Sequence, residues 1–149
     1  MKDITIRING RNNYEGNVED DTIDIVTEAK LYKRNNAIYL VYEESDIAGF
    51  DKCKTTVKIV DDKVKMKRFF ENGMPTEMEF KKGMRFSSKY FTPYGPFDLE
   101  ILTYGLDNTI DETGKGRLKL DYDISLNGKV NGRNSIDITL LEEGENELQ

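Results

Sequence analysis

Residues 117–126 read RLKLDYDISL, and apolar and polar side chains alternate along this stretch at almost every position. One set of alternate positions is apolar: Leu118, Leu120, Tyr122, Ile124 and Leu126. Because successive side chains of a β-strand point to opposite faces of a sheet, this pattern predicts a strand with one buried and one solvated face. The Asn127-Gly128 pair that follows is a strong hairpin signal, and it predicts an antiparallel return strand.

The same period of two extends over most of the chain. Further strands are expected at residues 2–9, 21–31, 37–44, 53–60, 63–70, 76–82, 85–92, about 97–106 and about 134–142. Asn-Gly also occurs at 9–10, 72–73 and 131–132, and each pair predicts a hairpin turn. A meander of this many strands closes most easily into a barrel, because closure removes the exposed sheet edges. The predicted fold is therefore all-β, a single antiparallel up-and-down barrel of about 8–10 strands.

Length and charge indicate one acidic domain. The chain has 149 residues, a net charge of −6 and an isoelectric point near 4.8. We expect a single barrel domain over residues 1–149, in which the acidic segment 143–149 is a frayed tail. The acidic balance disfavours duplex nucleic acid and anionic membranes as partners, since both require a basic face.

The residue types that are missing exclude several chemistries. The chain has no histidine and one cysteine, Cys53. Histidine-dependent nucleophilic sites, histidine-ligated metals, thiolate clusters and an intrachain disulfide are therefore excluded within this chain. No catalytic motif is present, so we expect a binding protein rather than an enzyme, with no cofactor and no metal. The N-terminal MKDITIRING lacks the apolar core of a signal peptide, and a cytoplasmic location is expected.

Five stretches together resemble one protein family. They are Tyr42-Glu43-Glu44, CKTTVKIVDDKVKMKR at 53–68, Met78-Glu79-Phe80, YFTPYGPFDLEILT at 90–103 and GRLKLDYDISL at 116–126. In this order they resemble the YwiB-like family of small bacterial proteins, over roughly residues 2–142. The resemblance implies a calycin-like, that is lipocalin-like, β-barrel of unknown function. One departure is visible, because the family pattern has a glycine soon after Arg68, whereas this chain continues with two phenylalanines.

Arg68 is the first candidate for a ligand contact. It shares the expected inward face of its strand with Val64 and Met66. A buried guanidinium needs a carboxylate or several carbonyls, and Glu44 is the expected partner. Three interpretations remain open: an interior ion pair, an arginine at the barrel end that reaches water, and an anchor for an anionic ligand head.

Tyrosines and a proline-rich turn complete the candidate site. The segment TPYGP at 92–96 suits a stiff turn, since two prolines restrict the backbone and a glycine permits a positive φ. This turn is either a plain corner or the lip of a ligand cavity, with its tyrosine over the barrel mouth. The candidate site for a small amphipathic or anionic ligand inside the barrel comprises Arg68, Glu44, Tyr42, Tyr90, Thr92, Tyr94 and Tyr122.

The outer surface offers an alternative site. Two neighbouring strands are expected to place a row of lysines on the outside, next to Phe69: Lys54, Lys58, Lys63, Lys65 and Lys67. This row is either a solvated face balanced by Glu77 and Glu79 or a surface that binds a protein or RNA partner. In the second case the barrel would be packed solid.

Overall fold

Ten β-strands make up the fold. The computed structural model describes residues 1–13, 21–45, 52–70, 75–92 and 94–141, and these residues contain no helix. The strands are β1 (Lys2–Asn13), β2 (Asp21–Arg34), β3 (Ala37–Ser45), β4 (Lys52–Val60), β5 (Lys63–Phe70), β6 (Thr76–Lys81), β7 (Arg85–Thr92), β8 (Gly95–Asn108), β9 (Arg117–Leu126) and β10 (Lys129–Leu141). They lie close to the ranges that alternation predicted. The acidic segment 143–149 lies outside the described residues.

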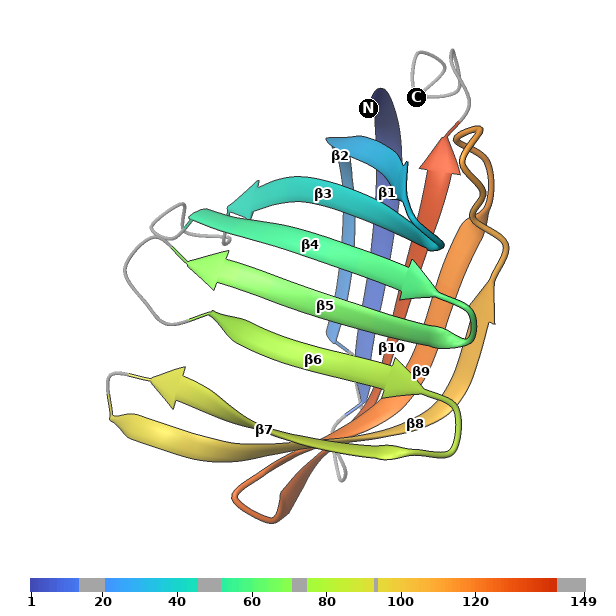
Figure 1. Ribbon diagram of the computed structural model, residues 1–149. Coiled ribbons are helices and arrows are strands. Elements are labelled where there is room, and N and C mark those ends of the chain that lie inside the picture. The colour runs from blue at the N-terminus through green and yellow to red at the C-terminus, as the bar shows by residue number, and fades with distance from the viewer. Residues whose placement is uncertain (14–20, 46–51, 71–74, 93, 142–149) are drawn as a thin grey trace.

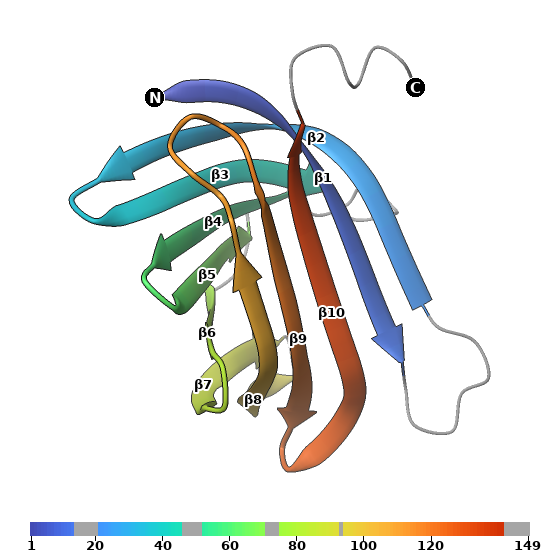
Figure 2. The ribbon, with the colours of Figure 1, turned by 90° about the vertical axis from the view of Figure 1, so that its right-hand side faces the viewer.

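All ten strands belong to one antiparallel sheet. Their order is β6-β5-β4-β3-β2-β1-β10-β9-β8-β7, so the first and last strands pair in the middle of the sheet. The sheet curls until β6 and β7 approach each other, and it forms a nearly closed barrel (Figure 1). In the orthogonal view, β1, β10 and β9 lie side by side in one wall (Figure 2). The predicted all-β, up-and-down, calycin-like barrel is therefore confirmed.

The barrel is interrupted between β6 and β7, and we call this interruption the seam. At one end of the seam the Gly83 N–H donates to the Thr103 carbonyl at 2.8 Å, and the Thr103 N–H donates to the Met84 carbonyl at 3.3 Å. These bonds attach the β6–β7 turn to β8. From that turn β6 and β7 diverge towards the opposite end of the barrel (Figure 1), and no strand ladder joins them.

The core contains the inward residues of the alternating pattern. Side chains less than 2% exposed include Ile6, Leu31, Leu40, Val57, Val64, Phe80, Ile101, Leu118, Leu120 and Ile138. In β5 the buried positions are Val64 and Met66, while the intervening lysine is exposed. A period of two therefore assigned inward and outward faces correctly, because one face packs inside and the other meets water.

Two predicted Asn-Gly turns are wrong. Asn9-Gly10 lies within β1, where both residues pair with β10 and β2. Asn131-Gly132 lies within β10 at a register shift between Val130 and Arg133, which marks a β-bulge. The Asn127-Gly128 turn already closes the β9–β10 hairpin, with φ values of 51° and 82°. A second turn four residues later would have no strand to pair, so the chain incorporates the glycine as a bulge. The pair at 72–73 lies outside the described residues.

The segment after Arg68 is regular despite its departure from the family pattern. Cross-strand pairs run without a shift from Val60↔Lys63 through Thr55↔Arg68 to Cys53↔Phe70. Strand β5 therefore has no bulge at Arg68, and its two final phenylalanines continue the alternation. Phe70 faces inward with Arg68, whereas Phe69 is 41% exposed on the outside.

Candidate functional site: a cavity at the barrel seam

A cavity opens where β6 and β7 diverge. Its volume is about 210 Å³, and five strands from β5 to β9 supply its lining. The lining residues are Arg68, Phe70, Thr76, Met78, Tyr90, Leu99, Ile124 and Leu126. The apolar core adjoins the cavity and shares Met78 and Leu99 with its lining. Within the described residues, this cavity therefore lies at the seam beside the packed core.

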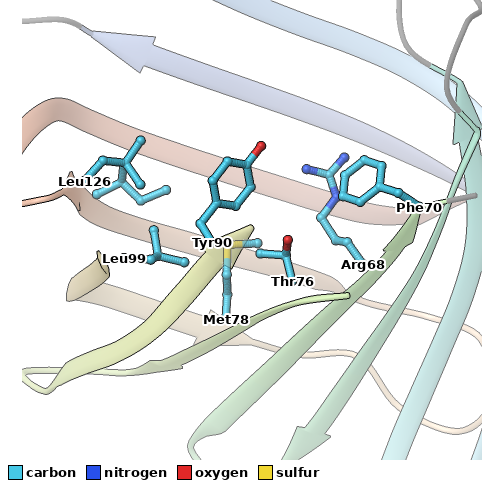
Figure 3. A pocket seen from close by; sticks show the side chains of 8 residues that line it. Arg68, Phe70, Thr76, Met78, Tyr90, Leu99 and Leu126 are labelled. Atoms are coloured by element: carbon cyan, nitrogen blue, oxygen red, sulfur yellow. The ribbon is translucent and has the colours of Figure 1, made fainter. Parts of the chain in front are cut away.

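The cavity has a polar end and an apolar end. In Figure 3 the guanidinium of Arg68 lies beside the ring of Phe70, and the Tyr90 hydroxyl points towards the same side. The Arg68 Cζ atom is 5.5 Å from the Phe70 ring centroid, the distance of a cation–π contact. Leu99 and Leu126 lie at the far end, and they are directly paired across β8 and β9. A molecule with one anionic head and one apolar tail would match this distribution.

The register explains why Arg68 lies among polar neighbours. Tyr42 pairs with Thr55, Thr55 with Arg68, and Arg68 with Thr76. These residues form a polar row across β3, β4, β5 and β6. Tyr42, Thr55 and Thr76 are each buried to at least 95%. Arg68 and Thr76 of this row also line the cavity, because they lie side by side near the end of β5 and the start of β6.

Tyr122 lies inside the core rather than in the cavity wall. Its side chain is 6% exposed, and its ring meets the Phe80 ring edge-on, with centroids 4.9 Å apart. Burial raises the pKa of Tyr122 to about 12, because the phenolate would lose its hydration, and the positive charge of Arg68 opposes part of this rise. The field of Arg68 therefore reaches the barrel interior.

The raised pKa of Tyr122 predicts an alkaline loss of stability. An unfolded tyrosine titrates near pH 10. Between pH 10 and 12, Tyr122 therefore loses its proton in the unfolded chain but keeps it in the folded chain. The contribution of Tyr122 to the free energy of unfolding is highest below pH 10 and falls as the pH rises through this range. We expect the free energy of unfolding to fall by about 1 kcal/mol more in the native protein than in Tyr122→Phe between pH 10 and 11. Urea unfolding at both pH values measures this difference, and equal losses in the two proteins would contradict it.

The structure separates the other predicted site residues. Tyr90 lines the cavity, whereas Tyr42 is buried next to it in the polar row. Glu44 pairs with Cys53 through its backbone, but its side chain lies outside the described residues, and so does that of Thr92. The expected partnership of Arg68 with Glu44 therefore stays a prediction.

Tyr94 occupies the tip of the β7–β8 hairpin. Thr92 and Gly95 pair across this hairpin, which makes the turn tight. The Tyr94 side chain is 92% exposed and is not one of the cavity-lining residues. A role for Tyr94 as a lip over the barrel mouth stays a prediction.

Sequence reasoning missed six of the eight residues that line the cavity. The missed residues are Phe70, Thr76, Met78, Leu99, Ile124 and Leu126. Each lies on the inward face that parity indicates, and Phe70 follows Arg68 by two positions. Parity therefore identifies the face, but it does not show that the barrel opens between β6 and β7.

The fold and cavity define a class: a single calycin-like β-barrel with a small amphipathic cavity. The chain belongs to the family described as Domain of unknown function (DUF1934), which matches residues 6–138. Its structure is similar to the crystal structure of the ywiB protein from Bacillus subtilis. The two share 26% sequence identity with a TM-score of 0.75, over 94% of this chain and 92% of that chain. The predicted resemblance to the YwiB-like family is confirmed. A search of the curated proteins finds no match.

Metal-binding clusters and membrane-spanning helices are both missing from the described residues. No group of three or more cysteine and acidic side chains there is arranged to hold a metal ion. None of the segments that the structure describes is a helix long and apolar enough to cross a membrane.

Proposed function

We propose that this protein is a non-enzymatic cytoplasmic binding protein, and that its cavity holds a small amphipathic anion. The observation that carries the proposal is the two-ended cavity, with a guanidinium at one end and paired leucines at the other. Pockets that bind small molecules are mostly apolar with a few placed polar groups, and this lining has that composition. A carboxylate suits the polar end, because a guanidinium presents five donors in a planar fork.

The size of the cavity limits the ligand. About 210 Å³ is less than the roughly 300 Å³ at which pockets for drug-sized ligands begin. This volume is that of roughly seven water molecules in liquid water. A short carboxylate such as hexanoate therefore fits, with its head at Arg68 and its chain between Leu99 and Leu126.

The interior position of Arg68 supports an electrostatic contribution. A hydrogen bond to a charged group contributes more in a partly buried site than in water, because the local dielectric constant is lower. Thr76 and Tyr90 bring two further hydroxyl groups to the cavity wall. A neutral alcohol of the same length would use the apolar wall but lose the charge-assisted bonds.

Titration with hexanoate and 1-hexanol, followed by protein NMR or calorimetry, tests the proposal. We expect native protein to bind hexanoate more tightly than 1-hexanol, and Arg68→Gln to weaken hexanoate binding by about tenfold or more. The same substitution should leave binding of 1-hexanol almost unchanged. Equal affinity of native protein and Arg68→Gln for hexanoate would overturn the head-group assignment.

A second variant tests the tail end of the cavity. Leu126→Phe adds bulk to the apolar wall and leaves Arg68 in place. Leu126 is only partly buried, so the extra atoms can be accommodated without repacking the core. We expect this variant to lose binding of both hexanoate and 1-hexanol. Retained binding would place the ligand elsewhere.

A further inference from the structure

The outward face of β4 and β5 carries a row of lysines, most of which form no ion pair within the described residues. Its lysines are Lys54, Lys58, Lys63, Lys65 and Lys67, and we call this surface, together with Phe69, the basic face. Lys63 forms an ion pair with Glu79. The other four lysines have no ion pair with any carboxylate in the described part of the chain.

Ion pairs form more often on the other described strands of the exterior. On β1, β2, β9 and β10, cationic and anionic side chains form ion pairs between neighbouring strands: Arg7 with Asp24, Arg117 with Asp137, and Arg133 with Asp121. Three lysines of the basic face lie opposite carboxylates on the flanking strands without forming an ion pair with them: Lys54 opposite Glu43, Lys65 opposite Glu79 and Lys67 opposite Glu77. Lys58, in contrast, lies directly opposite Lys65. Like charges at directly opposed positions are destabilising, and a bound polyanion would relieve this repulsion.

Aromatic rings lie among these lysines. Lys67 Nζ is 5.3 Å from the centroid of the Phe69 ring, and Lys58 Nζ is 5.8 Å from that of Tyr39. Phe69 is 41% exposed at the end of β5. Tyr39 stacks on Tyr32 of the neighbouring strand with centroids 4.9 Å apart. Lysines interleaved with accessible aromatic rings are the pattern with which proteins bind single-stranded nucleic acid.

We propose that the basic face binds single-stranded nucleic acid, with phosphates at the lysines and a base stacked on Phe69. Accessible rings can stack on the bases of a single strand, whereas the bases of a duplex already stack on one another. An acidic protein surface is the alternative partner, and it could form ion pairs with the lysines. Its carboxylates would not contact the exposed ring of Phe69 as a stacked base does. The net charge of −6 is distributed over the whole molecule. Salt screens charges that are more than about 10 Å apart, so distant carboxylates repel phosphates at the basic face only weakly.

Fluorescence anisotropy with labelled 12-nucleotide oligo-U and oligo-dT tests this proposal at 20 and 150 mM salt. Each neutralised phosphate of a single strand contributes about −0.7 to the salt slope, so four lysines predict a slope of about −3. We expect Lys58→Glu/Lys67→Glu to weaken binding at least tenfold. The matched control, Lys119→Glu/Lys129→Glu, alters exposed lysines outside the basic face and changes the net charge equally, and its affinity should stay within twofold of native. Circular dichroism establishes that both variants fold.

Phe69→Ala separates stacking from charge. We expect about tenfold weaker binding with an unchanged salt slope, because a stacking contact is lost and no charge is altered. Binding of either oligonucleotide supports the proposal, and a preference for oligo-U would indicate contacts to the 2′-hydroxyl groups. Absent binding at 20 mM salt, equal losses in the two charge-reversed variants, or equally tight binding of polyglutamate would each overturn the proposal.

Discussion

Replacing Gly116 with alanine is expected to destabilise the barrel by at least about 3 kcal/mol. Gly116 has a φ of +121°, which an L side chain rarely adopts. A Cβ atom there would lie 2.5 Å from the Thr109 carbonyl carbon, 2.6 Å from Ile110 Cα, and closer still to the Thr109 oxygen. All three atoms belong to the backbone, so no side-chain rotation can relieve the overlap.

The backbone around Gly116 cannot move away easily. The Thr109 N–H donates to the Arg117 carbonyl at 2.9 Å on one side of this contact. On the other side, the Leu140 N–H donates to the Gly116 carbonyl at 3.0 Å. Moving the segment to admit a methyl group would break one of these bonds, and the unpaired groups would add to the cost.

Gly83→Ala is the matched control for this prediction. Gly83 also has a positive φ of +80°, but nothing lies within 4 Å of the Cβ position. Its substitution should cost only the backbone strain, about 1 kcal/mol. Urea unfolding of the two variants compares them directly. A Gly116→Ala variant within about 1 kcal/mol of Gly83→Ala would show that the segment adapts to the methyl group.

The second large effect is expected at Phe80. Its side chain is fully buried, and its ring packs edge-on against Tyr122. Val64, its cross-strand partner in β5, is fully buried as well. Phe80→Ala should lower the free energy of unfolding by about 3–5 kcal/mol, because it removes an aromatic side chain and leaves a cavity between packed strands. This loss is comparable with the whole stability of many domains.

Phe80→Leu keeps most of the apolar volume and provides a folded control if the alanine variant does not fold. Its cost should be about 1.5 kcal/mol or less. Thermal and urea unfolding at neutral pH measure both variants. A loss below about 1.5 kcal/mol for Phe80→Ala would mean that β6, as an edge strand at the seam, moves inward and fills the space.

Local alternation predicted the architecture because burial acts on each strand separately. The pattern in β9 placed Leu118, Leu120 and Tyr122 on one face, and the structure buries all three. The same parity placed Arg68 inward and Phe69 outward, as the cavity lining and the exposed ring show. Each assignment needs only the rule that neighbouring side chains point to opposite faces.

Asn-Gly pairs illustrate where local reasoning failed. The dipeptide permits the positive φ values of a tight turn, but it forms one only where the flanking segments can pair with each other. Asn127-Gly128 meets that condition. Gly10 instead lies between Ser135 of β10 and Ile23 of β2, because the two ends of the chain pair in the middle of the sheet. A contact between β1 and β10 has no local signal.

The sequence by itself determined that the chain forms antiparallel strands, which residues face inward, and that histidine chemistry is absent. Only the tertiary structure decided where the barrel opens. The cavity joins Arg68 of β5 with Tyr90 of β7 and Leu126 of β9, three residues that share no local pattern. Their proximity follows from the closure of the whole sheet and from the seam between β6 and β7. Closure depends on the pairing and twist of all ten strands together, whereas alternation depends only on whether each strand has water on one side.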